Sequence, residues 1–169
     1  MEIYLLRHGE AGKRAAAPAK DQERALTALG RREIEEIGEA MAKRGYKFDA
    51  VLTSPLKRAK ETAAIVTRTL KRKTTLEEWP ELSPEGNRDA FYRKLAKIRP
   101  GSSVLVVGHE PYLTTAIGEI VGRGGEGQAG MRIVLKKGGL AKLYVTGFTP
   151  RVTGELRWLL TPKQIRKLA

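Results

Sequence analysis

Cysteine is absent from this chain of 169 residues. Disulfide bonds, thiolate metal sites and a cysteine nucleophile are therefore all excluded. Long apolar runs are absent too, since no stretch approaches the roughly 20 consecutive apolar residues that a membrane-spanning helix requires. Residues 2–6 follow the initiating methionine with no basic region and no small-residue cleavage site of the kind a secretory signal carries. The sequence predicts a cytoplasmic protein with no membrane partner.

Aromatic residues are scarce, at 6% of the chain, while basic residues are abundant. The formal net charge is +13, which favours anionic partners: phosphorylated substrates, acidic protein surfaces, nucleic acid or polyphosphate. Charge alone does not choose among these partners. The basic runs Lys71–Lys73 and Lys163–Lys167 contain no interleaved aromatic residue of the kind that stacks on nucleic-acid bases. We interpret both runs as solvated faces and predict no specific nucleic-acid partner.

The length and the hydrophobic content of 41% are typical of one compact domain, which we place over residues 1–169. In the first 122 residues, apolar runs of strand length alternate with longer amphipathic stretches. The predicted strands are Ile3–Leu6, Ala50–Thr53, Thr74–Glu77 and Val104–Val107. The predicted helices run from a cap at Thr27 to a stop at Gly45, from Ser54-Pro55 to about Leu70, over Arg88–Ile98, and from Pro111 to near Gly122.

The pattern changes near the carboxyl end, where strands are predicted at Arg132–Leu135, Ala141–Val145 and Glu155–Leu159. Gly and Pro turns separate them, and no long helix intervenes. This order predicts a three-layer α/β/α domain with a mainly parallel central sheet and some antiparallel pairing near the carboxyl end. The segment Gly125–Gly130 has the letters of a dinucleotide-binding loop, but it follows a predicted helix and precedes a predicted strand, the reverse of the required context. We interpret it as a turn and predict no cofactor.

The two histidines of the chain both lie in loops that follow predicted strands. His8 stands in Arg7-His8-Gly9-Glu10, and His109 stands in Gly108-His109-Glu110-Pro111. A third such loop, residues 54–58, carries Arg58. Ligands of open α/β sheets bind outside the carboxyl ends of the strands. We therefore expect these three loops to converge on one pocket.

These residue types suit phosphoryl transfer. A neutral imidazole is a good nucleophile near neutral pH and forms covalent intermediates, which makes His8 a candidate nucleophile. Arg7 and Arg58 offer planar, permanently charged groups that pair with phosphate oxygens. His109 could add a further hydrogen bond to the same group. This set needs no metal to neutralise the phosphoryl group, and no metal is predicted.

The order of the motifs resembles that of the histidine phosphatase superfamily, the phosphoglycerate mutase-like fold family. The hallmark Arg-His-Gly is present as residues 7–9, and the Ser-Pro pair that precedes the second arginine is present as residues 54–55. The second histidine of the family resembles His109, and residues 26–30 resemble its Leu-Thr-x-x-Gly segment. Together the matches span about two-thirds of the chain in family order. The resemblance implies a metal-independent phosphatase with a transient phosphohistidine on His8, and phosphate binding by Arg7, Arg58 and His109.

Within that superfamily, the short length and the segment Pro80–Pro84 look most like the SixA-type phosphohistidine phosphatases. That resemblance implies removal of phosphate from histidine on a protein, such as a histidine phosphotransfer domain. Only a short stretch separates Leu70 from Pro80, which leaves no room for the insertions that shape a small-substrate pocket. We expect a shallow, open site.

A carboxylic acid that protonates the leaving oxygen assists hydrolysis of phosphoesters by about 10²–10⁴-fold. Glu81 and Glu78 are the candidates, and family position places Glu81 first. A phosphoramidate leaves more readily and can take its proton elsewhere. Glu81 is equally well interpreted as a solvated or helix-capping carboxylate.

Other interpretations of the same residues remain open. Glu10 and Glu110 could join the histidines as metal ligands, although a divalent ion would lie poorly beside two arginines. Ser54 is better interpreted as a helix cap than as a nucleophile. For the whole chain, the alternatives are a small-molecule phosphomonoesterase of the same superfamily and a phosphate- or polyanion-binding module without catalysis.

Overall fold

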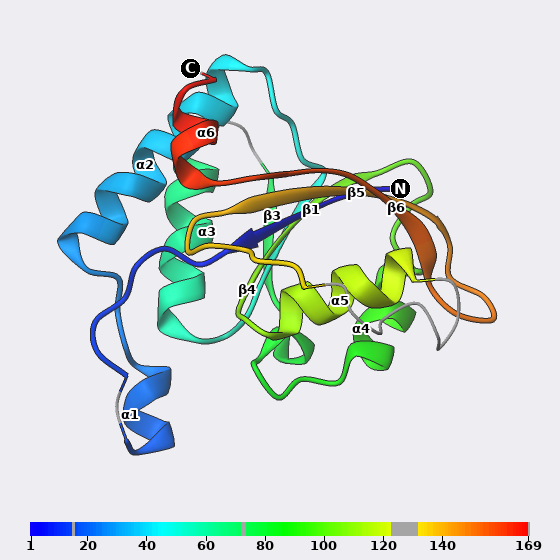
Figure 1. The fold of residues 1–169 in the computed structure, drawn as a ribbon, viewed down its shortest axis with the longest axis horizontal. Coiled ribbons are helices and arrows are strands. Elements are labelled where there is room, and N and C mark those ends of the chain that lie inside the picture. Colours follow the sequence, from blue (N-terminus) through cyan, green and yellow to red (C-terminus); the bar gives the residue numbers. More distant parts are fainter. Residues whose placement is uncertain (15, 72–73, 123–131, 169) are drawn as a thin grey trace.

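The computed structural model describes residues 1–14, 16–71, 74–122 and 132–168, and it shows a six-stranded sheet with helices on both faces (Figure 1). The strands are β1 (Glu2–Arg7), β2 (Ala50–Thr53), β3 (Thr75–Glu78), β4 (Ser103–Gly108), β5 (Leu140–Gly147) and β6 (Thr153–Leu160). The helices are α1 (Pro18–Gln22), α2 (Ala28–Lys43), α3 (Lys57–Thr69), α4 (Arg88–Leu95), α5 (Tyr112–Val121) and α6 (Pro162–Arg166), with a 3-10 turn η1 (Pro80–Leu82).

The strand order in the sheet is β3-β2-β4-β1-β5-β6. Strands β3, β2, β4 and β1 pair in parallel, whereas β5 runs antiparallel to both β1 and β6. The predicted sheet, mainly parallel with antiparallel pairing near the carboxyl end, is confirmed. The parallel part brings the carboxyl ends of β1, β2 and β4 to one edge.

Both faces of the sheet are covered, because successive side chains of a strand point to opposite faces. On β1, Ile3 and Leu5 belong to the core cluster that α4 and α5 complete. Tyr4 and Leu6 belong to a second cluster on the opposite face, completed by α2 and α3. A sheet that is buried on both sides requires near-continuous apolar strands, as in the run Val104–Val107.

The helix α2 begins and ends as the sequence predicts. The Thr27 hydroxyl accepts a hydrogen bond from the Gly30 amide at 3.0 Å, and Gly45 after the last turn has a φ of +73°. Helix α4 ends at Leu95, three residues earlier than predicted. The amide of Ile98 bonds to the carbonyl of Leu95 in a tighter turn, because residues approaching Pro100 are disfavoured in helix.

The predicted strand at Arg132–Leu135 is wrong. Residues 132–136 pair with none of the six strands. The carbonyl of Leu135 instead accepts a hydrogen bond from the Arg7 side chain, and Val134 is 70% exposed. Two short helices, α1 and α6, were not predicted, since each has only five residues.

Among the described residues, no helix is both long and apolar enough to span a bilayer. The segment Gly125–Gly130, and two residues of the basic run Lys71–Lys73, lie outside the described part of the chain.

Candidate active site

Adjacent strands place the two histidines side by side. Arg7, the last residue of β1, lies opposite Gly108, the last residue of β4. His8 and His109 come next in the chain, and their ring centroids are 5.0 Å apart. Ser54 follows β2 at the same edge, one strand further along the sheet. The three predicted loops therefore meet.

The hydrogen bonds of His8 define its tautomer. Its Nδ1 lies 2.7 Å from the Gly9 carbonyl oxygen, which can only accept, so Nδ1 carries a proton. Its Nε2 lies 3.3 Å from Nε of Arg58, which can only donate. His8 is therefore the neutral tautomer with its lone pair on Nε2, directed at a guanidinium group.

The environment of His8 keeps it neutral. Burial is the main cause that lowers its pKa, to about 4, and the charges of Arg58, Arg7 and Arg24 lower it further. The hydrogen bond to Gly9 acts in the opposite direction. An imidazole with this pKa is unprotonated at neutral pH, which is the state that can attack phosphorus.

His109 has a different partner. Its Nε2 lies 2.8 Å from the Ser54 hydroxyl oxygen, which also accepts a hydrogen bond from the Leu56 amide. Its Nδ1 is buried and has no hydrogen-bond partner in the described part of the chain. Burial, followed by the proximity of His8 and Arg58, lowers the pKa of His109 to about 3. Ser54 therefore orients His109, and α3 begins at Lys57 without a side-chain cap, which corrects the prediction that Ser54 caps this helix.

Arg58 is the central cation of the site. Only 4% of it is exposed. Its Nη1 donates to the backbone carbonyl of Asp21 at 2.8 Å and lies 3.4 Å from a carboxylate oxygen of the same residue. Arg58 thus joins His8 to the short helix α1, which is remote in sequence.

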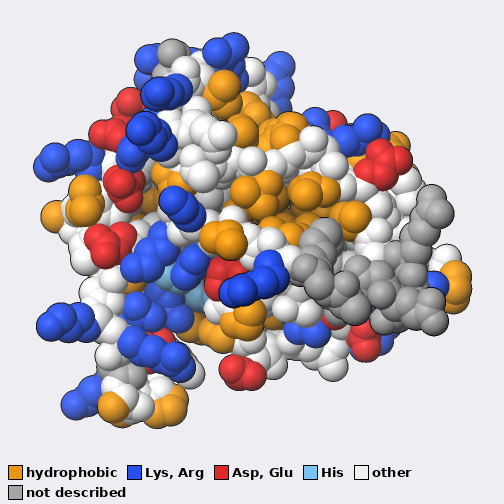
Figure 2. Space-filling view, viewed as in Figure 1, with side chains coloured by type: hydrophobic (Ala, Val, Ile, Leu, Met, Phe, Trp, Pro, Cys, Tyr) orange, Lys and Arg blue, Asp and Glu red, His pale blue; other side chains and the backbone are white. Residues whose placement is uncertain are grey.

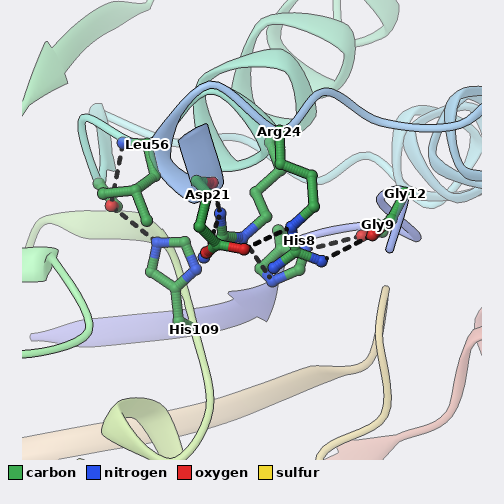
Figure 3. Close-up of polar contacts among 9 residues, drawn as sticks. His8, Gly9, Gly12, Asp21, Arg24, Leu56 and His109 are labelled. Atoms are coloured by element: carbon green, nitrogen blue, oxygen red, sulfur yellow. Dashed lines mark hydrogen bonds and ion pairs between the residues drawn. The ribbon is translucent and has the colours of Figure 1, made fainter. Parts of the chain in front are cut away.

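Asp21 and Arg24 are site residues that sequence reasoning missed. Nε of Arg24 lies 3.0 Å from the second carboxylate oxygen of Asp21, and its Nη1 donates to the Gly12 carbonyl at 2.9 Å. Figure 3 shows the Asp21 carboxylate close to the two imidazole rings and the guanidinium groups. The only signal in the sequence was an acidic and a basic residue three positions apart, which is common on any solvated helix.

Arg7 lies at the side of the site. Its Nη1 donates to the Leu135 carbonyl at 2.9 Å, and its Nε is buried without a hydrogen-bond partner in the described residues. Glu110 lies near enough that its charge favours the charged form of Arg7, while burial lowers the pKa of that guanidinium. Arg7 and His8 share no direct hydrogen bond among those described, and their coupling is electrostatic.

The two candidate acids contact other residues. Glu81 lies in η1 and forms an ion pair with Lys94 at 3.3 Å. Glu78 forms a weak, exposed pair with Lys60 at 3.5 Å. None of the described contacts joins either carboxylate to His8 or His109, so the role of Glu81 as an acid stays a prediction.

The candidate metal ligands also have other partners. Glu10 lies 3.7 Å from Nζ of Lys137, and Glu110 accepts a hydrogen bond from the Thr114 hydroxyl at 2.6 Å. Within the described ranges, no three His, Asp or Glu side chains are grouped so that they could share a metal ion.

The surface view shows this site from outside (Figure 2). Histidine atoms are visible between clustered Lys and Arg side chains, close to α1. The arrangement unites a neutral nucleophilic imidazole, a second imidazole and three guanidinium groups. Such a set can bind a phosphoryl group and stabilise charge on its equatorial oxygens.

Comparisons with known proteins agree with this arrangement. The model of the histidine phosphatase superfamily (branch 1) matches residues 3–84. An uncharacterized protein of Picosynechococcus sp. (strain ATCC 27264 / PCC 7002 / PR-6) is 34% identical over 171 residues, which cover 96% of this chain and 98% of that relative. The phosphohistidine phosphatase SixA of Escherichia coli (strain K12) is 30% identical over 122 residues, covering 71% of this chain and 74% of SixA.

Solved structures of related phosphatases have the same fold as this chain. The protein histidine phosphatase SixA complexed with tungstate superposes with a TM-score of 0.80 at 26% identity, over 96% of this chain and 98% of that chain. The alpha-ribazole phosphatase of Shigella flexneri has a TM-score of 0.70 at 20% identity, over 96% and 97% of the two chains, and shares the fold.

The fold and these matches support a phosphatase. The chain belongs to the histidine phosphatase superfamily, and its similarity is to the SixA type.

Proposed function

We propose that this protein removes phosphate from phosphohistidine on a protein, through a phosphorylated His8. The observation that carries the proposal is the neutral His8 imidazole, whose Nε2 lone pair is directed at Arg58. In the first step Nε2 attacks phosphorus, a new N–P bond forms and the bond to the leaving group breaks. In the second step water attacks phosphorus, phosphate departs and His8 returns to its neutral form.

The remaining groups have distinct roles in this mechanism. Arg58, Arg7 and His109 bind the equatorial oxygens of the phosphoryl group, where negative charge accumulates. The Gly9 carbonyl accepts a hydrogen bond from His8 Nδ1. Because Nδ1 therefore keeps its proton in both steps, Nε2 remains the nitrogen that reacts. Neither step requires a cofactor or a metal.

The placement of Glu81 supports phosphohistidine as the substrate. When the leaving group is an imidazole whose other ring nitrogen carries a proton, it departs as a neutral base, and no acid has to protonate the nitrogen that leaves. An alkyl or aryl ester leaves as an alkoxide or phenoxide and gains most from an acid. Glu81 forms an ion pair with Lys94, and none of the described contacts joins it to either histidine, which favours the labile phosphoramidate. The similarity to SixA, itself named a phosphohistidine phosphatase, supports the same choice.

The test compares the wild type with His8→Ala, in the presence of chelator, on a phosphohistidine protein and on an aryl phosphate. We expect phosphohistidine turnover that persists in chelator, and a loss of at least about 10³-fold in the variant. The variant Glu81→Gln is the second arm, in which phosphohistidine turnover should change less than about twofold. Full turnover by His8→Ala would exclude the mechanism.

Two other outcomes would identify the alternatives. A higher kcat/KM for small phosphate esters than for the phosphoprotein would assign a small-molecule phosphatase of the same superfamily. Salt-sensitive binding of polyanions with no phosphoenzyme at all would assign a binding module.

A further inference from the structure

The described contacts that join helix α1 to Arg58 are polar. None of its residues, Pro18–Gln22, is buried, so the helix contributes little to the apolar core. Its link to α3 is the Asp21–Arg58 pair, made through both the backbone carbonyl and the carboxylate. The segment therefore depends on charges that an incoming phosphoryl group would also engage.

The Asp21 carboxylate bridges two guanidinium groups of the site. One oxygen lies 3.4 Å from Nη1 of Arg58, and the other lies 3.0 Å from Nε of Arg24. Its charge also reaches His109, whose protonated form it favours. Figure 3 shows the carboxylate beside the imidazole rings, and 17% of the Asp21 side chain is exposed.

This position has two opposite consequences for a bound phosphoryl group. A fixed negative charge beside the site repels a phosphate dianion and competes with it for Arg58. The same carboxylate restrains Arg58, which must remain beside His8 so that, once its Nε releases the Nε2 lone pair, the guanidinium holds the phosphoryl oxygens and aligns phosphorus with Nε2. Removing the charge should therefore strengthen phosphate binding while weakening alignment.

We propose that Asp21 is a positioning residue: its carboxylate holds Arg58 in line with His8 and lowers the affinity of the site for inorganic phosphate, the product. This inference rests on the proposed function for its kinetic part. The predicted change in affinity for inorganic phosphate does not depend on catalysis. It applies to any phosphate site that these residues form.

The decisive variant is Asp21→Asn, with Glu23→Gln as the matched control. Glu23 is exposed and lies two residues further along, so the control removes the same charge from the same segment without touching Arg58. Calorimetric titration with inorganic phosphate should show binding by Asp21→Asn that is about threefold to tenfold tighter than wild type. In turnover assays the kcat of Asp21→Asn should fall by about tenfold, and phosphate should inhibit it more strongly. Glu23→Gln should change each quantity less than about twofold.

A conservative variant separates positioning from simple stability. Asp21→Glu keeps the charge, so phosphate affinity should return toward the wild-type value and part of the kcat should be restored. Thermal unfolding should be nearly unchanged in all three variants, because α1 buries no residue. The split between tighter phosphate binding and slower turnover is not expected from a general loss of structure, which would weaken both.

Phosphate binding by Asp21→Asn that is unchanged or weaker would overturn the proposal. So would a wild-type kcat in that variant, or equal effects in Glu23→Gln. Absence of any turnover in the wild type would contradict the proposed function instead, and the calorimetric comparison would still decide the role of Asp21 in binding phosphate.

Discussion

Burial, more than any single neighbouring charge, sets the protonation of His8 and His109. The pKa values of about 4 and about 3 lie below the usual value of 6.5, and desolvation is the largest cause for each. Arg58 adds to the effect on both, because a cation disfavours a second cation nearby. The two side chains are therefore a neutral pair across the pH range in which most phosphatases act.

These lowered pKa values make stability depend on pH. Between the folded and the unfolded pKa, the unfolded chain binds more protons, so the free energy of unfolding falls as the pH falls. The stabilisation is complete above about pH 6.5 and is lost as the pH falls toward about 4 and then about 3. Between pH 7 and pH 4.5 the free energy of unfolding falls in both proteins. We expect the fall to be about 2 kcal/mol smaller in His109→Asn than in the wild type.

Urea denaturation at the two pH values measures this difference. Acidic residues titrate in both proteins, so their contribution largely cancels when the two changes are compared. The quantity compared is the change in the free energy of unfolding between the two pH values. Equal losses in the two proteins would show that His109 titrates in the folded state as it does in the unfolded chain.

The sequence alone was enough to place both histidines and Arg58, because each follows a recognisable strand and stands in a short ordered motif. It was not enough for Asp21 and Arg24. Their contacts join a five-residue helix to α3 and to the loop after β1. The hydrophobic periodicity of a sequence does not predict a polar contact between segments so far apart in the chain. The partner of Glu81 was equally invisible, since Lys94 lies on the next helix.

At the scale of elements, close contact between the His8 loop and the start of α2 fixes the position of that loop. A Cβ added at Gly30 would lie 2.1 Å from the Glu10 carbonyl oxygen, and one added at Gly9 would lie 2.6 Å from Ile34. The same carbonyl of Glu10 accepts a hydrogen bond from the Thr27 amide at 3.0 Å. Gly30 lets its backbone approach the Glu10 carbonyl, and Gly9 leaves room for the Ile34 side chain.

We therefore expect Gly30→Ala to cost about 1–3 kcal/mol of stability, because a backbone carbonyl must move to admit the methyl group. The movement would displace the loop that carries His8, so kcat should fall as well. Gly12→Ala is the matched control in the same loop, since nothing lies within 4 Å of a Cβ built there. Thermal unfolding and turnover of the two variants would test this, and equal behaviour would contradict the contact.

The strands show where element prediction succeeds and where it stops. The run Val104–Val107 is buried on both faces and could hardly be anything but a central strand. Arg132–Leu135 is apolar in three of its four residues, yet it pairs with no strand, and its Leu135 carbonyl accepts a hydrogen bond from the Arg7 side chain. The local pattern indicates which segments can form strands, whereas tertiary contacts decide which of them do.

At the scale of the whole molecule, the charge of +13 creates a positive potential that acts on anions beyond the site itself. Lys and Arg side chains surround the histidines in Figure 2. Arg14 is exposed, and its charge acts on Arg58. Potentials of this kind raise the rate at which an anionic macromolecule meets the site, and salt suppresses the effect.

We expect kcat/KM for an acidic phosphoprotein to fall steeply with ionic strength, and that for an aryl phosphate to fall less. The small substrate meets mainly the arginines at the site, whereas a protein also feels charges within a screening length of about 10 Å at 0.1 M salt. Stopped-flow measurement of His8 phosphorylation from about 20 mM to 500 mM salt would compare the two substrates.

Two charge reversals locate the effect. Arg14→Glu and Lys163→Glu change the net charge equally, but Lys163 is exposed on α6, which lies far from α1 and the site in Figure 1. At low salt, Arg14→Glu should reduce kcat/KM for the acidic phosphoprotein by about tenfold, and Lys163→Glu by less than about twofold. Equal losses would mean that net charge alone matters, and that the cations around the histidines do not guide the substrate to them.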